Sequence, residues 1–186
     1  MDTKAQPQQS LTPNPSHTYR ILTVGLRQFR RPDTNHPTWT KPWDWQTMLR
    51  LPGLHPERTQ TAWERLHSVG INITTAVDLL PPGGDFLAEE AERAAAYLRG
   101  VVEGLNEADQ TGSNLGYDIV ALLGGRVADA FCASDKRLHD MRLLSLRDMG
   151  SYGVVILPSP HIVETGESWW SSAEKQRALR DAVAGW

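Results

Sequence analysis

The sequence predicts an α/β fold in three layers, with a central, mainly parallel four-stranded sheet between helices. Four short apolar runs recur along the chain, and stretches of helical character separate them. The 186 residues are 40% hydrophobic and 22% charged, the size and balance of one soluble globular domain. We assign this domain to residues 18–186. Residues 1–17, rich in Gln, Pro, Ser and Thr, are expected to form a disordered tail.

The four predicted strands share an apolar, largely β-branched composition and end at turn residues. The first covers residues 19–25, and the second covers residues 71–80 and ends at consecutive prolines. The third, residues 117–123, and the fourth, residues 153–157, are nearly continuous apolar runs, which is typical of strands buried on both faces. A small additional element is expected over residues 143–146.

Helix patterns lie between and after these strands. An amphipathic stripe ends at Gly70, a typical stop residue, and the longest helical stretch is rich in alanine. Gly124 and Gly125 lead the third strand directly into a helix, and a serine begins the last one. The expected helices cover residues 43–51, 57–69, 86–105, 126–132 and 172–184.

Composition narrows the classes of function. The single cysteine, Cys132, excludes an internal disulfide and a multi-cysteine metal site, and it favours a buried structural thiol in a reducing cytoplasm. No apolar run is long enough for a membrane span. The net charge of −3 argues against tight nonspecific nucleic-acid binding, although residues 18–50 hold six basic and two acidic side chains. That uneven distribution predicts one basic face, or simply a solvated loop.

Unusual residues follow three of the predicted strands, at residues 25–29, 78–82 and 158–161. Ligands of parallel α/β sheets bind beyond the carboxyl ends of the strands. We therefore expect these three segments to meet on one rim and to form the site. A long loop over residues 26–42 follows the first strand, and a loop of this length is usually functional or disordered.

Four segments in this order resemble the uracil-DNA glycosylase superfamily, and the layout is most similar to its mismatch-specific uracil/thymine branch. They are ILTVG at 21–25, ITTAVD at 73–78, VALLGGRVA at 120–128 and VVILPSPH at 154–161. The resemblance covers roughly residues 19–170 and implies the fold of that superfamily. It also implies an enzyme that flips a base out of DNA and hydrolyses its N-glycosidic bond, without metal or cofactor.

The segment after the first strand departs from the family. Family members carry an Asn or Asp there that positions the attacking water, whereas this chain has Arg27, and a guanidinium is not a base at neutral pH. The water-positioning group is then Gln28, or an acid or amide later in the loop. Asp33 is our first choice and Asn35 the second, with Asp44 also open, and each is equally well interpreted as a solvated loop residue.

The resemblance assigns further substrate contacts. Phe29 stands where the family stacks an aromatic ring on the base, although a core phenylalanine fits equally well. Thr75 replaces the amide that reads uracil in some branches, so the substrate is expected to differ from plain uracil. The remaining expected substrate contacts are Gly25, Arg27, Asp78 and Ser159.

The last motif differs from the family in its order. It has Ser159-Pro160-His161 where the family has His-Pro-Ser or Asn-Pro-Ser, and His161 can still stabilise the departing base, unless it is a structural histidine. The loop after it is expected to be the wedge that enters the duplex. The expected DNA contacts are Arg30, Arg31, Lys41, Arg126, Ile162 and Val163.

The sequence thus predicts a cytoplasmic, monofunctional DNA glycosylase acting on a modified pyrimidine. Its role would be base excision in DNA repair or antiviral defence against phage with modified DNA. DNA is the expected partner, without a membrane or an evident obligate protein partner, and no cofactor or metal is expected. An inactive glycosylase-fold module that binds DNA or protein stays open, because Arg27 replaces the water-positioning residue. A nucleotide-binding enzyme using Gly124-Gly125-Arg126 is the weaker alternative, since two glycines lack the longer phosphate-binding pattern.

Overall fold

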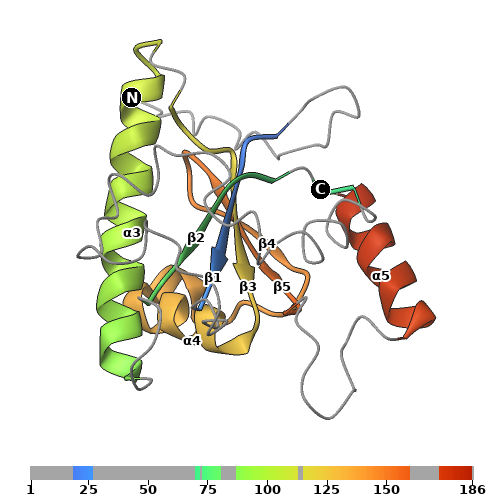
Figure 1. Ribbon diagram of the computed structural model, residues 1–186. Helices are drawn as coiled ribbons and strands as arrows, with labels where there is room; N and C mark the ends of the chain where they lie inside the picture. The colour runs from blue at the N-terminus through green and yellow to red at the C-terminus, as the bar shows by residue number, and fades with distance from the viewer. Residues whose placement is uncertain are drawn as a thin grey trace, which may run out of the picture.

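A computed structural model describes residues 19–26, 70–71, 73–80, 87–112, 115–159 and 172–185, and the account below concerns these residues. They form an α/β fold with a five-stranded sheet and α-helices on both of its faces (Figure 1). The elements are β1 (Ile21–Gly25), β2 (Ile73–Asp78), α3 (Ala88–Asp109), β3 (Ile119–Leu123), α4 (Gly125–Ser134), η2 (Lys136–Leu138), β4 (Leu146–Asp148), β5 (Gly153–Leu157) and α5 (Ala173–Ala184).

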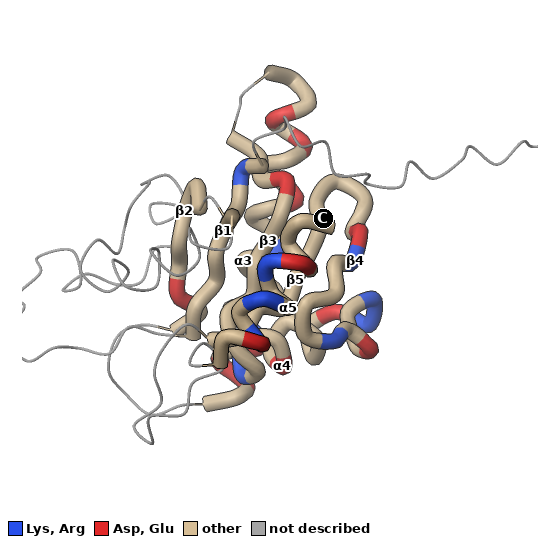
Figure 2. The backbone as a smooth tube through the Cα atoms, turned by 90° about the vertical axis from the view of Figure 1, so that its right-hand side faces the viewer, with Lys and Arg blue, Asp and Glu red and all other residues tan. Residues whose placement is uncertain are grey.

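The strand order in the sheet is β2-β1-β3-β5-β4. Figure 2 shows this order across the sheet, with α5 in front of it. The first four of these strands run parallel, and β4 pairs antiparallel with β5. The four predicted strands are all present, with bounds within a few residues, and the predicted α/β class is confirmed.

The prediction of four strands was wrong by one, because β4 makes the sheet mixed and five-stranded. The strand β4 has only three residues, Leu146-Arg147-Asp148, and two of them are charged. No run of apolar residues therefore identifies it in the sequence. An antiparallel neighbour needs only a tight turn. Here the amide of Met149 donates to the carbonyl of Tyr152 at 2.9 Å, and Gly150 has a φ of 99°. The element expected at 143–146 is limited to a bridge between Leu143 and Ile156 and the first residue of β4.

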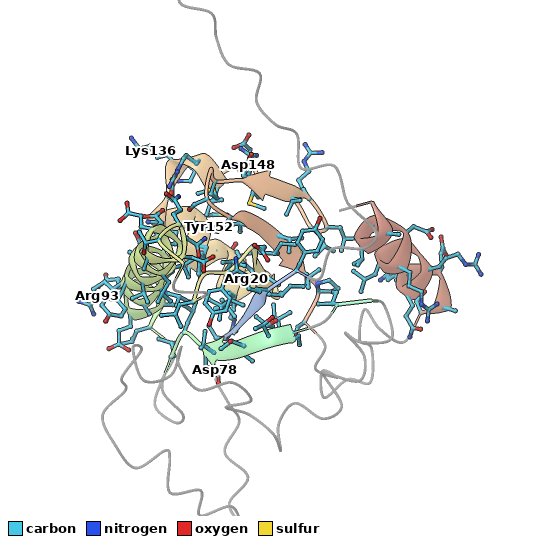
Figure 3. The ribbon with its side chains drawn as sticks, turned by 90° about the horizontal axis from the view of Figure 1, so that it is seen from above. Arg20, Asp78, Arg93, Lys136, Asp148 and Tyr152 are labelled. Carbon is cyan, nitrogen blue, oxygen red and sulfur yellow. The ribbon has the colours of Figure 1, made fainter. Side chains whose placement is uncertain are left out.

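Alternation along the strands divides the core between two faces. Leu22 and Val24 of β1 point to the side of α3 and α4, into a cluster that includes Phe131. Ile21 points to the opposite side, where Leu179 of α5 packs. Figure 3, which views the molecule from above, shows the sheet between α3 with α4 on one side and α5 on the other.

The described α-helices agree with the predicted ones except at their ends, and the 3-10 helix η2 was not predicted. The helix α3 continues four residues beyond the predicted end at Leu105, and α4 is longer than residues 126–132. Ser172 is the N-cap of α5, and its hydroxyl accepts a hydrogen bond from the amide of Lys175 at 3.4 Å. The predicted helices over residues 43–51 and 57–69 lie outside the described residues.

Polar side chains hold the edge of the sheet at which the parallel strands begin. Arg20 donates to Asp109 at the end of α3, at 2.8 Å, and to Asp118 just before β3, at 3.1 Å. The hydrogen bond from Arg20 holds the pKa of Asp109 below its usual value. This cluster joins α3, β1 and β3 at the edge opposite the carboxyl ends of the parallel strands, so we assign it to the framework of the fold.

Buried Tyr152 predicts a loss of stability at alkaline pH. Its hydroxyl lies 3.5 Å from Oε1 of Glu103, and burial, together with that carboxylate, raises its pKa to about 12. An unfolded tyrosine ionises near pH 10, so the stabilisation is complete below pH 10 and is lost as the pH rises from 10 toward 12. We expect Tyr152→Phe to flatten this decline by about 2 kcal/mol, measured by urea unfolding at a series of pH values.

Tyr97 provides the matched control for this measurement. It lies on the solvent side of α3 and is 46% exposed. Tyr97→Phe should follow the wild-type curve of unfolding free energy against pH. If the unfolding free energy of wild type and of Tyr152→Phe falls equally steeply above pH 10, ionisation of Tyr152 is not the cause of the alkaline loss of stability.

Candidate functional site

The carboxyl ends of the four parallel strands lie at one edge of the sheet, which we call the carboxyl edge. Here β1 ends at Gly25, β2 at Asp78, β3 at Leu123 and β5 at Leu157. β1 lies between β2 and β3, and β3 lies between β1 and β5. The strand pairing brings together segments distant in the sequence, such as Ile21 and Ile119, and the described rim residues 25–26, 78–80 and 158–159 lie at this edge.

The ends of β1 and β2 are bound together beyond the last paired residues. Gly25 is opposite Asp78 in the parallel register. The pairing continues as the amide of Leu79 donates to the carbonyl of Gly25, and that of Leu80 to the carbonyl of Leu26, both at 2.9 Å. Asp78 is 1% exposed, so its carboxyl group is enclosed by the protein. Figure 3 shows Asp78 on the β2 side of the sheet, away from Lys136 and Asp148.

Gly124 joins the ends of β3 and β5. Its amide donates to the carbonyl of Leu157 at 2.8 Å, and its φ of 89° lies in a region that favours glycine. A Cβ placed on Gly124 would lie 3.2 Å from the Cβ of Ser159. The absence of a side chain at Gly124 thus permits the close approach of Ser159, the residue that the sequence predicts to contact substrate.

The helix α4 begins at this same edge. Gly125 is its first residue, a Cβ there would meet open space, and Arg126 is exposed in the first turn. The first amides of a helix and an exposed arginine together favour anionic groups. The contact of Arg126 with DNA stays a prediction.

The structure brings four of the predicted site residues to the carboxyl edge: Gly25, Asp78, Arg126 and Ser159. The predicted water-positioning and leaving-group residues lie outside the described residues, so their placement stays a prediction. The same holds for the basic loop and the wedge. These residues are Arg27, Gln28, Phe29, Arg30, Arg31, Asp33, Asn35, Lys41, His161, Ile162 and Val163.

Thr75 is the described site residue that the structure does not bring to this edge. It pairs with Leu22, three residues before the end of β1, and it is buried. Its hydroxyl is hydrogen-bonded to the hydroxyl of Tyr117 at 3.0 Å, and Tyr117 belongs to the core cluster on the α3 side of the sheet. In this arrangement Thr75 has a structural partner in the core.

Thr23 is a buried polar residue of β1 that the sequence analysis did not select. Its side chain is 3% exposed, and its hydroxyl has no hydrogen-bond partner among the residues that the structure describes. Threonine is a common strand residue, so its presence in the run Ile21-Leu22-Thr23-Val24 signals nothing by itself. Only the burial and the unpaired hydroxyl single it out.

Cys132 is half-buried in α4, and its thiol lies 2.9 Å from the carbonyl oxygen of Leu138. Burial raises the pKa of this thiol, which keeps it protonated and favours the predicted structural role. Within the described part of the chain, no group of three or more His, Cys, Asp or Glu side chains could hold a metal ion. None of the helices described there is long and apolar enough to cross a membrane.

The amino-acid sequence of this chain matches no protein-family model and no curated protein.

Proposed function

We propose that this chain is a DNA glycosylase that encloses an everted base at the carboxyl edge and hydrolyses its N-glycosidic bond, leaving an abasic site. The observation that carries the proposal is the meeting of Gly25, Asp78, Gly124 and Ser159 at one edge. They come from the four segments that resemble the uracil-DNA glycosylase superfamily, so the segments carrying the resemblance are also those that the strand order brings together.

The chemistry needs few groups. Negative charge grows on the departing base as the bond breaks, and positive charge grows on the sugar, so the site must hold a hydrogen-bond donor for the base and a water on the far side of the sugar. In our proposal His161, two residues after Ser159, is the donor, and Asp33 or Asn35 positions the water; Gln28 and Asp44 are the other candidates. None of these steps requires a redox centre.

Charge at the carboxyl edge supports one direction of approach for DNA. The helix α3 begins at this end of the molecule (Figure 1), and its first turns expose Glu89, Glu90 and Glu92. Phosphates are repelled by that surface. Arg126 is exposed in the first turn of α4, whereas the first turns of α3 expose three acids against one base, Arg93. We therefore propose that the duplex lies toward α4 and away from the first turns of α3.

The substrate proposed is a modified pyrimidine rather than plain uracil. Thr75 replaces the amide of the family, and its hydroxyl is bonded to Tyr117, so Thr75 does not supply the pair of hydrogen bonds by which that amide reads uracil. Excision of such a base would serve DNA repair or defence against phage whose DNA is modified. A protein that releases uracil readily and ignores modified pyrimidines would contradict this choice of substrate.

The test is release of a base from duplexes that carry a single uracil, 5-hydroxymethyluracil, 5-hydroxymethylcytosine or an unmodified base. Alkali cleavage then reports abasic sites. Asp33→Ala and His161→Ala are expected to lower the rate by about a hundredfold or more, while duplex binding is retained. The matched controls are Asp181→Ala and His139→Ala, which change exposed residues of the described chain and should cleave like wild type.

The alternative is an inactive module that binds DNA or protein through the same edge. It is favoured by Arg27, which stands where the family positions its water. Duplex binding by the wild type without an abasic site on any of these substrates would overturn the glycosylase proposal in favour of this alternative.

A further inference from the structure

Two neighbouring pairs of residues form a small block of sheet surface beside the carboxyl edge. In the parallel register Thr23 of β1 lies opposite Ala76 of β2, and Gly25 lies opposite Asp78. All four residues are buried. Alternation from Ile21, which packs with Leu179, places this block on the α5 side of the sheet. We call these four residues the β1–β2 block.

The surface of the block differs from the other face of the sheet behind it. On the α3 side these stretches of β1 and β2 present Leu22, Val24 and Val77 to a continuous apolar cluster, together with the hydroxyl pair of Thr75 and Tyr117. On the α5 side the block holds two polar side chains, an alanine and a glycine. The apolar cluster under α5 includes Ala121 of β3, whereas Ala76 belongs to neither of the two clusters of the described residues. Small and polar groups therefore gather at one place, next to the proposed site.

The hydroxyl of Thr23 is the group that points to a ligand. It is buried, and the residues that the structure describes offer it no hydrogen bond. Burying a hydroxyl without a hydrogen-bond partner destabilises a fold, so such a group indicates a partner from outside the chain, such as a ligand. Because Thr23 is enclosed, a ligand that bonds to it must itself be enclosed by the protein, as an everted base is.

We propose that Thr23 is a substrate-binding residue that reads the polar edge of the enclosed base. Its hydroxyl donates to a ring acceptor, while Asp78, a diagonal neighbour on the same face, accepts from the adjacent ring donor. A carboxylate accepts several hydrogen bonds, so Asp78 has capacity for this one beside its other contacts. The ligand class is a planar heterocycle with an acceptor next to a donor, such as a pyrimidine. The inference rests on the proposed function.

Two threonines of neighbouring strands give a matched pair of variants. Valine keeps the shape of threonine and removes only the hydroxyl. Thr23→Val removes a hydroxyl without a described partner, so we expect a melting temperature within about 2 °C of wild type, or higher. Thr75→Val removes the oxygen that accepts the hydrogen bond of the Tyr117 hydroxyl on the other face, so its melting temperature should fall by about 3 °C or more.

The probes are free uracil, cytosine and 5-hydroxymethyluracil, with dissociation constants measured by calorimetry on the full chain. We expect the wild type to bind at least one of them, Thr23→Val to bind it about tenfold more weakly or worse, and Thr75→Val to bind it within about twofold of wild type. Equal affinity of wild type and Thr23→Val would overturn the inference, and so would a wild type that binds none of the three bases.

Duplex cleavage by the same variants separates this inference from the glycosylase proposal. Thr23-dependent binding of a free base, without cleavage of any duplex, supports the role of Thr23 and refutes the glycosylase. Cleavage at the same rate by wild type and Thr23→Val supports the glycosylase and refutes the role of Thr23.

Discussion

Replacing Asn106 with alanine will lower the free energy of unfolding by about 3 kcal/mol, one of the largest effects that we expect from a single substitution in this chain. The Asn106 side chain is 5% exposed and makes three hydrogen bonds. Its Nδ2 donates to the carbonyls of Tyr117 and Ser151, both at 2.9 Å, and its Oδ1 accepts from the amide of Tyr117 at 2.7 Å. One side chain of α3 thereby satisfies backbone groups beside the starts of β3 and β5.

The size of the effect follows from what the substitution leaves behind. Alanine removes all three hydrogen bonds, two of which are made with buried backbone groups of Tyr117, and the loss of each buried bond costs about 1–3 kcal/mol, less than additively. Urea unfolding measures the change. Glu107→Ala, on the next residue of α3 but exposed, is the control and should stay within about 0.5 kcal/mol of wild type. Equal stability of the two variants would mean that the Asn106 contacts contribute little.

Gly124→Ala will destabilise the protein by about 2 kcal/mol, and, if the proposed function holds, it will also slow base release at least tenfold. The φ of 89° at Gly124 is costly for alanine, and the new Cβ would lie 3.2 Å from the Cβ of Ser159. Relief of that contact moves Ser159, and a small displacement of a substrate contact lowers the rate strongly.

The neighbouring glycine is the matched control for this prediction. A Cβ at Gly125 meets nothing within 4 Å, so Gly125→Ala should be neutral or slightly stabilising. Both variants are compared by urea unfolding and by alkali cleavage of a modified duplex. If the two glycine variants lose the same stability and the same activity, Gly124 has no special part in the approach of β3 and β5.

Local patterns in the sequence were sufficient for most of the elements. The strands β1, β2, β3 and β5 were each marked by a run of apolar residues, and Gly124 marked the turn from β3 into α4. Ser172 was among the expected leading residues of α5, because a serine N-cap acts on amides only three residues away. Such features depend on neighbours in the sequence, so a single sequence contains them.

Part of the site was also predictable, for a reason of topology. Parallel strands bring their carboxyl ends to one edge, so the positions of Gly25, Asp78 and Ser159 follow from the strands alone. Which face of β2 each residue occupies does not follow as easily. The register between β1 and β2 shifts between Ile21 and Leu22, where the hydroxyl of Thr74 accepts from the amide of Ile21 at 3.0 Å. Past this irregularity Thr75 lies on the α3 side.

By itself, then, the amino-acid sequence determined the α/β class, the parallel strands and the edge at which their ends meet, since each depends on the periodicity of nearby residues. Tertiary structure alone decided that β4 pairs with β5, that Asn106 bridges α3 to two strand starts, and that Thr23 and Thr75 lie on opposite faces with unlike surroundings. These outcomes arise from contacts between residues distant along the chain. The free energy of such a contact depends on burial and on the partner that packing supplies, and neither is encoded in the local pattern.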